Sequence, residues 1–295
     1  MLRKKDLSSV IKLYYSLTKP GIIYGNAITA VGGFFLASKG QINLGLFIAM
    51  LLGLTFVIAS ACVFNNYLDR GIDKKMARTK KRALATGLIP EENAIIYAII
   101  LILLGVLVLA HFTNFVTLVI ALAGFFFYVI VYTYAKRYTK YGTIIGSISG
   151  AIPPVVGYTS VSNTIDLGAM LLFLILVLWQ MPHFYAIALY RLNDYKAASI
   201  PVLPIKEGVF RTKLQMLFYI FAFLVAVDLL SFFHYTGMFY LTIMTVLIAG
   251  WFIMGLRGFK KNTVSDAHWG RKMFFFSLII ILALSIMMSV DASFF

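Results

Sequence analysis

Charged residues are scarce in this sequence. Asp, Glu, Lys and Arg make up 13% of its 295 residues, whereas hydrophobic residues make up 61%. Soluble globular domains carry about 25% charged residues. The composition therefore excludes a soluble globular protein and indicates an integral membrane protein.

Cysteine and acidic residues are scarcer still. Cys62 is the only cysteine and lies in an apolar run, so no disulfide can form within the chain and we expect a small buried side chain. The 11 acidic residues are outnumbered by 26 Lys and Arg. Such an excess occurs in nucleic-acid-binding proteins, but it also marks the cytoplasmic loops of membrane proteins. The positions of the basic residues must decide between the two.

Nine apolar runs are long enough to cross about 30 Å of hydrocarbon as helices. They lie near residues 20–38, 42–66, 91–110, 113–135, 142–161, 166–190, 213–233, 237–256 and 272–290. With a cytoplasmic N-terminus, 25 of the 26 Lys and Arg fall on the cytoplasmic side and only Lys39 falls outside. This bias predicts an all-α polytopic membrane protein with nine transmembrane helices and its C-terminus outside. We expect the protein to lie in the lipid bilayer and to bind no nucleic acid.

Residues 1–295 are expected to form a single membrane-embedded domain, in which residues 1–19 are a cytoplasmic N-terminal segment. The cytoplasmic loops 67–90 and 191–213 exceed twenty residues and carry charges of both signs, whereas the outward loops are very short. Binding residues concentrate in loops that a rigid scaffold positions. The two long loops are therefore predicted to be active-site loops.

Asn65, Asp69 and Asp73 are spaced four residues apart, so they form one stripe if the second span continues as a helix. Hard oxygen ligands in such a stripe suit Mg²⁺ carrying a phosphate group. The seven Lys and Arg between residues 70 and 82 suit a diphosphate. The alternative is that Arg70 and Lys74 merely neutralise the two carboxylates on a solvated helix end.

The spacing N-x-x-x-D-x-x-x-D at the end of the second span resembles the signature of the UbiA-type intramembrane prenyltransferases. Within that superfamily, five stretches are similar to the haem O synthase subfamily. They read SLTKPGI (16–22), CVFNNYLDRGIDKKMARTKKRALATG (62–87), YAKRYTKYGTIIGSISGAIPPVVGY (134–158), WQMPHFYAIALYRLNDYKAASIPVLP (179–204) and WGRKMFFFS (269–277). The resemblance thus extends along the whole chain.

The resemblance implies a UbiA-type helical bundle in the bacterial cytoplasmic membrane. It would transfer the farnesyl group of farnesyl diphosphate to a vinyl group of haem b, with addition of water. Asn65, Asp69 and Asp73 would bind Mg²⁺ and, with Asp194, form the catalytic set. The cations expected to bind diphosphate are Lys19, Arg70, Lys74, Arg78, Lys81, Lys136, Arg137, Arg191 and Lys196. Haem A synthase or a terminal oxidase are expected assembly partners.

Asp194 separates this chain from relatives that form quinones. Those members usually carry a second aspartate-rich motif after the sixth span, but here Asp194 stands alone and the position four residues later is Ala198. This contrast argues against the alternative acceptor, an aromatic quinone precursor. A local pair between Asp194 and Arg191 is the competing structural interpretation.

The stretch WQMPHF supplies candidate haem-binding residues, namely His183, Trp179 and Gln180. Neutral imidazole suits iron, although an isolated histidine in a membrane helix is often only hydrogen-bonded within the bundle. Lys136 and Arg137 have a similar alternative as interface anchors. Gly142, Gly146 and Gly150 are spaced by four, which favours close helix packing.

A membrane transporter is the alternative from another functional class, because nine spans alone do not indicate catalysis. Asp228 is the acidic residue within a predicted span that favours it. The Asn65, Asp69 and Asp73 stripe favours an enzyme, since it lies outside the hydrocarbon, whereas transport sites lie near the midplane.

Overall fold

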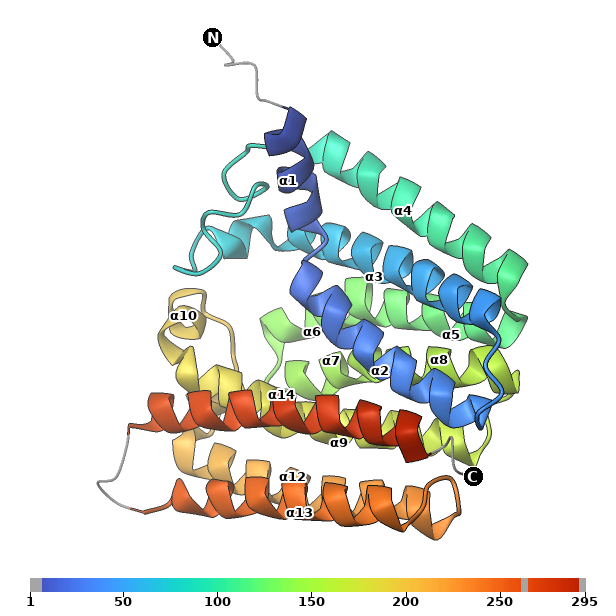
Figure 1. The fold of residues 1–295 in the computed structure, drawn as a ribbon. Coiled ribbons are helices and arrows are strands. Elements are labelled where there is room, and N and C mark those ends of the chain that lie inside the picture. Colours follow the sequence, from blue (N-terminus) through green and yellow to red (C-terminus); the bar gives the residue numbers. More distant parts are fainter. Residues whose placement is uncertain (1–6, 261–264, 292–295) are drawn as a thin grey trace.

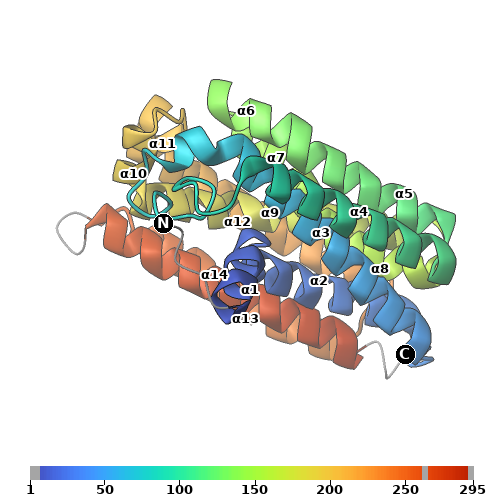
Figure 2. The same ribbon diagram turned by 90° about the horizontal axis from the view of Figure 1, so that it is seen from above.

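The computed structural model describes residues 7–260 and 265–291, and every regular element in these two ranges is a helix (Figures 1 and 2). The elements are α1 (Leu7–Leu17), α2 (Pro20–Ser38), α3 (Leu44–Asp73), α4 (Glu91–Phe112), α5 (Phe115–Phe126), η1 (Phe127–Tyr132), α6 (Thr133–Tyr138), α7 (Gly142–Gly150), α8 (Ile152–Ser162), α9 (Leu167–Tyr190), α10 (Leu192–Ala197), α11 (Leu203–Lys206), α12 (Gly208–Phe232), α13 (Met238–Arg257) and α14 (Asp266–Asp291).

In the described part of the chain, nine segments are long and apolar enough to cross a membrane, which confirms the predicted count. Two of them are composite. The fourth span, Phe115–Tyr138, joins α5, the π-helix η1 and α6, and the fifth, Gly142–Ser162, joins α7 and α8. The second span is longer than predicted, because α3 continues beyond residue 66 to Asp73. Helical structure can continue there because water is available to the charged side chains beyond the hydrocarbon.

The spans pack around α9, whose buried residues extend along the helix. α9 contacts α7, α8, α12 and α14, and α2 contacts α3, α8 and α14 (Figure 1). α14 also contacts α13, so it lies between α2 on one side and α9 and α13 on the other. The bundle is therefore closed by its final helix.

α2 and α8 cross at a point where glycine is required. A Cβ atom on Gly33 would lie 2.0 Å from the carbonyl oxygen of Pro154, and one on Gly157 would lie 2.0 Å from that of Ala30. These distances are shorter than any van der Waals contact, so the two backbones touch directly. Small residues permit this close approach in membranes, where packing drives helix association.

The predicted packing role of the glycines in the fifth span is confirmed. A Cβ atom on Gly142 would meet the Lys136 backbone, one on Gly146 would meet the Tyr132 ring, and one on Gly150 would meet the Gln180 amide. α7 is thus held tightly against η1, α6 and α9. The helix breaks at Ala151, just before Pro153 and Pro154, because proline cannot donate the backbone hydrogen bonds that would continue α7.

The segments that follow α3 and α9 lie at the same end of the bundle. Figures 1 and 2 show the 74–90 segment and helices α10 and α11 together at that end. The predicted 67–90 loop is in fact a turn-rich segment that begins after Asp73, and the predicted 191–213 loop contains α10, α11 and the start of α12. The first six residues, which carry part of the predicted N-terminal segment, lie outside the described residues.

Candidate active site

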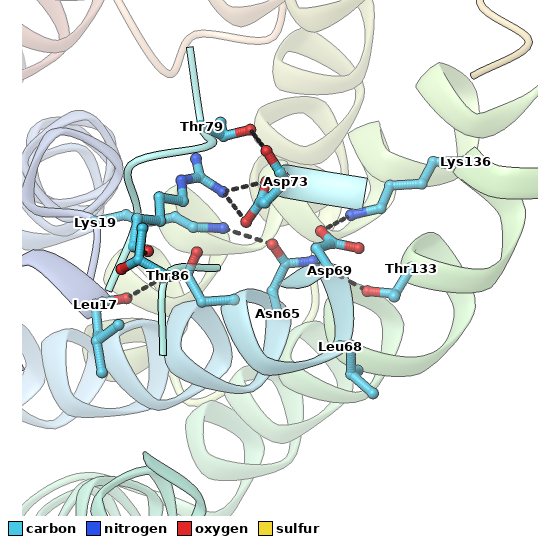
Figure 3. A network of polar contacts seen from close by, with 12 residues as sticks. Leu17, Lys19, Asn65, Leu68, Asp69, Asp73, Thr79, Thr86, Thr133 and Lys136 are labelled. Carbon is cyan, nitrogen blue, oxygen red and sulfur yellow. Dashed lines mark hydrogen bonds and ion pairs between the residues drawn. The ribbon is translucent and has the colours of Figure 1, made fainter. Parts of the chain in front are cut away.

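Asn65, Asp69 and Asp73 lie on one face of α3, as their spacing predicts (Figure 3). All three are buried, with exposed fractions of 2%, 6% and 5%. Two buried carboxylates one helical turn apart require compensating positive charge. The surrounding elements supply it from several directions.

Asp69 is bound by two cations from the end of the fourth span. Lys136 Nζ contacts one carboxylate oxygen, and Arg137 Nη2 donates to the other at 3.1 Å. Arg137 Nη2 also donates to the backbone oxygen of Leu68 at 2.6 Å. The expectation that Lys136 and Arg137 reach this region agrees with their positions, and both side chains point toward α3 rather than along the surface as anchors.

Asp73 is bound by Arg82 from the turn-rich segment. Arg82 Nη1 lies 3.0 Å from Oδ1 and 2.9 Å from Oδ2 of Asp73. The hydroxyl of Thr79 donates to the Asp73 backbone oxygen at 3.0 Å. The 74–90 segment therefore folds back over the end of α3, and Arg82 holds it there.

Asn65 is contacted from opposite sides, as Figure 3 shows. Lys19 Nζ donates to its Oδ1 at 2.5 Å, and its Nδ2 donates to Thr133 Oγ1 at 3.2 Å. Lys19 precedes α2 in a left-handed conformation with φ of 51°, which turns the chain at Pro20. Partial burial lowers the pKa of the Lys19 ammonium from its ordinary value of 10.5 to about 8, and the nearby Asp69 carboxylate opposes this shift.

The chemistry of these donors fits Mg²⁺. The stripe offers two carboxylates and one amide oxygen, which are hard ligands, and Mg²⁺ usually takes one or two carboxylates together with substrate phosphate oxygens. Within the described residues no group of three or more His, Cys, Asp and Glu side chains is placed to hold a metal by itself. Coordination positions would thus be left for phosphate oxygens or water.

Other predicted cations are distributed around this centre. Arg78 is exposed on the 74–90 segment. Arg70 points elsewhere, since its Nε donates to Glu91 at 2.6 Å and its guanidinium covers the Tyr67 ring. Three further predicted cations, Lys74, Lys81 and Lys196, are exposed.

Asp194 and Arg191 lie at the start of α10, at the same end of the bundle as the 74–90 segment. Both are half-buried and line a surface hollow with Tyr190 and Asn193. The Arg191 guanidinium lies 4.4 Å from the centre of the Tyr190 ring. The next residue, Tyr195, is half-buried, and α10 contacts α9 and α11.

The three candidate haem residues lie on α9 but face two neighbours. Trp179 and His183 face α14, where Trp179 Nε1 donates to the Ser277 backbone oxygen at 3.0 Å and the two rings stack at 4.6 Å. Gln180 faces α7 and donates to the Ser147 oxygen at 3.1 Å. His183 Nδ1 lies 2.7 Å from Ser277 Oγ.

The hydrogen bonds around Ser277 assign the tautomer of His183. The Ser277 hydroxyl donates its single proton to the Phe274 backbone oxygen at 2.6 Å. Ser277 Oγ must then accept from His183, so the imidazole proton is on Nδ1. Nε2 therefore keeps its lone pair, and the neutral imidazole is the form in which histidine binds a metal.

Sequence reasoning missed several residues of this centre. Arg82 was expected only as one of the seven basic residues suited to a diphosphate and not as a partner of Asp73, and Thr133 and Tyr195 were not considered. The spacing of Thr133 and Lys136 on α6 offered a weak signal, since three residues separate neighbours on one helix face. Arg82 and Tyr195 carried no such signal, because turns and tertiary contacts place them.

Asp228, which kept the transporter alternative open, lies between α12 and α13. Its Oδ1 accepts a hydrogen bond from Thr245 at 3.1 Å. A hydrogen bond between neighbouring spans accounts for a polar side chain at this depth. The aspartate stripe on α3 is a separate feature at the end of the bundle.

Comparisons with known proteins agree with this geometry. The profile of the UbiA prenyltransferase family matches residues 26–279. The chain is 51% identical over 282 residues to a protoheme IX farnesyltransferase of Protochlamydia amoebophila, covering 96% of this chain and 99% of the relative. It is also 51% identical over 283 residues to a protoheme IX farnesyltransferase of Yersinia pseudotuberculosis, covering 96% and 95%.

Solved structures share the fold. A structure of digeranylgeranylglyceryl phosphate synthase aligns with a TM-score of 0.79 at 20% identity, covering 97% of this chain and 99% of the other. A UbiA homologue from Archaeoglobus fulgidus bound to GPP and Mg²⁺ aligns with a TM-score of 0.67 at 17% identity, covering 94% and 100%. The bundle, the aspartate stripe and the matched profile lead to one assignment: this multi-pass membrane protein is a member of the UbiA prenyltransferase family.

Proposed function

We propose that this chain transfers the farnesyl group of farnesyl diphosphate to a vinyl group of haem b, with addition of water, giving haem O and diphosphate. The observation that carries the proposal is 51% identity over nearly the full length of proteins named protoheme IX farnesyltransferase. The lone Asp194, in place of a second aspartate-rich motif, supports a haem rather than a quinone precursor as acceptor.

Asn65, Asp69 and Asp73 would hold Mg²⁺ with the diphosphate. When bound, the metal neutralises charge on the diphosphate and so makes it a better leaving group. The cations that now contact the stripe, Lys19, Lys136, Arg137 and Arg82, have N–H groups that a diphosphate would also accept. They would stabilise the charge that grows on the leaving oxygen as the C–O bond breaks.

The remaining steps need only the acceptor and one water molecule as reactants. The allylic carbon released from the diphosphate forms a C–C bond with the terminal vinyl carbon of the acceptor. The cation that results beside the pyrrole ring takes up water and loses one proton. The chain's task is to exclude bulk water until the C–C bond has formed, and the burial of the stripe serves that task.

We further propose that the haem lies against α9, with Trp179, Gln180 and His183 as candidate contacts. The lone pair on His183 Nε2 supports a role as an iron ligand. Arg191 caps the neighbouring α10 and Lys196 lies on it, and both would bind carboxylate or diphosphate groups of the substrates. Asp194 would complete the catalytic set. Arg78, Lys74 and Lys81 would complete the basic surroundings of the diphosphate.

The same proposal extends to location and partners. The basic end of the bundle would face the bacterial cytoplasm, with residues 1–295 acting as one membrane-embedded domain. Haem A synthase or a terminal oxidase would receive the product, because haem O is poorly soluble in water and direct transfer avoids its release.

The test is to incubate the purified full chain with haem b, farnesyl diphosphate and Mg²⁺ and to analyse the products by mass spectrometry. We expect a haem carrying one farnesyl group and one water. Asp69→Asn and Asp73→Asn should each lower the rate about a hundredfold or more. Unchanged rates in both variants, or no product from folded parent protein, would overturn the proposal.

A further inference from the structure

A groove of about 430 Å³ opens on the outer flank of the bundle, away from the aspartate stripe on α3. Its lining comes from the 139–141 loop and from α7, α9, α11 and α12. Tyr185 of α9 is buried and forms part of the lining, and its hydroxyl donates to Gln215 at 3.1 Å. The volume lies within the range of about 300–1,000 Å³ that is usual for sites of small molecules.

One side of the groove is polar: Lys140 and Glu207 line it, and Arg211 lies beside Glu207 at its edge with an exposed side chain. Lys140 Nζ lies 2.5 Å from Glu207 Oε1, and Arg211 Nη1 approaches Glu207 Oε2 at 3.9 Å. Two cations thus share one carboxylate. The hydrogen bond from Lys140 lowers the pKa of Glu207, so the carboxylate is ionised at neutral pH. The cluster carries a net charge of about +1 with N–H groups to spare.

The other side of the groove is apolar and faces outward from the spans. Ile144, Leu214 and Phe218 have exposed fractions of 39%, 46% and 66%, and each lies in a membrane-spanning segment. Apolar side chains on these segments are in contact with lipid. The groove therefore joins a cationic cluster to a hydrocarbon-facing surface over a short distance.

We propose that this groove binds one anionic glycerophospholipid. Its phosphate would lie between Lys140 and Arg211, where a single negative charge balances the cluster, and its acyl chains would follow Ile144, Leu214 and Phe218. A zwitterionic lipid brings its own ammonium group to the same cations and is disfavoured. The basic end of the bundle is also the end at which an anionic leaflet is expected.

The experiment compares lipids and variants in the purified full chain. Native mass spectrometry measures retained lipid after titration with phosphatidylglycerol or phosphatidylcholine, and thermal unfolding is followed in parallel. The groove variant is Lys140→Gln/Arg211→Gln. The matched control is Lys206→Gln, which removes an exposed cation next to Glu207 in sequence, whereas Lys140 and Arg211 are the cations that pair with the Glu207 carboxylate. Glu207→Gln removes the ion pairs with Lys140 and Arg211 but keeps both cations, so it tests whether the positive charge or the ion pairing matters for lipid binding.

We expect phosphatidylglycerol to be retained in preference to phosphatidylcholine by the parent and by Lys206→Gln. The groove variant should weaken its apparent affinity about tenfold or more. Glu207→Gln should retain phosphatidylglycerol at least as well as the parent, because it leaves both cations. Equal retention of the two lipids, or a loss in Lys206→Gln as large as in the groove variant, would overturn the proposal.

Two further arms test other occupants. If inorganic phosphate alone reproduces the thermal shift, the groove is an ion site and the lipid proposal fails. If haem b displaces the lipid and the groove variant abolishes haem binding, the groove belongs to the acceptor, and the lipid proposal fails as well. Either result leaves the assay of farnesyl transfer to judge the proposed function separately.

Discussion

At the scale of single residues, the cations around the aspartate stripe differ in what they contact. Arg82 binds both carboxylate oxygens of Asp73, whereas Arg70 binds Glu91 and covers Tyr67. Both arginines are close to the motif in sequence, and only the structure separates them. This contrast supplies a matched pair of substitutions.

Arg82→Gln should lower kcat/KM for farnesyl diphosphate about a hundredfold, because it removes a charge that would contact the leaving group. Arg70→Gln should change it less than about threefold, since Arg70 forms a partly exposed pair. Steady-state kinetics with both substrates varied would measure this, with thermal unfolding of each variant as the control for folding. Equal losses in the two variants would contradict the assignment.

His183 provides a second test at this scale. His183→Asn should raise the KM for haem b about tenfold and leave the KM for farnesyl diphosphate unchanged, because the proposed iron ligand is lost. The Soret band of bound haem should shift as well, which a packing role alone would not cause. Ser277→Ala is the companion variant, since it removes the acceptor for Nδ1–H and keeps the imidazole.

At the scale of elements, the contact between α2 and α8 shows how little space the bundle leaves. Gly33 and Gly157 each place a neighbouring carbonyl where a Cβ atom would be. Gly25, which lies on α2 with Gly33, has open space around it. Substituting Gly33 or Gly25 therefore distinguishes the effect of losing a glycine from the effect of disturbing the α2–α8 contact.

Gly33→Ala should destabilise the fold by about 1–3 kcal/mol, because the added methyl group forces the two backbones apart. Gly25→Ala should leave stability unchanged or raise it slightly, since alanine is the better helix former. Thermal unfolding in one detergent would compare both variants with the parent. A similar loss in the two variants would show that the α2–α8 contact does not limit stability.

At the scale of the whole molecule, the nine spans were predictable because the hydrocarbon requires long apolar helices. The stripe of Asn65, Asp69 and Asp73 was predictable on the condition that the second span continues as a helix, since helical spacing then places the three residues on one face. The extension of α3 to Asp73 was not, because hydropathy ends near residue 66 and Gly71 disfavours a helix.

The contacts of the stripe depend on structure that a single sequence does not encode locally. Arg82 reaches Asp73 through a series of turns without hydrophobic periodicity. The π-helix η1 shifts Thr133 and Lys136 around the axis of the fourth span, and such a bulge has no local sequence signature. Long-range packing decides both, and it is common for π-bulges to occur at functional sites.

Orientation in the membrane is the prediction that concerns the entire chain. Because Cys62 is buried with an exposed fraction of 1%, single cysteines introduced at the surface give clean labelling. In intact bacterial cells, Gln41→Cys should react with a membrane-impermeant maleimide, and Lys206→Cys should react only after permeabilisation. The reverse pattern would place the basic end outside.

The position of α14 between α2, α9 and α13 has a consequence for how the protein is made. Spans enter the bilayer in the order of synthesis, so lipid must occupy the place of α14 until the ninth span emerges from the ribosome. Ser285 and Met288 then take up the space beside Gly32. Insertion of the ninth span therefore exchanges lipid for protein, and α2, α9 and α13 reach their final packing only after this exchange.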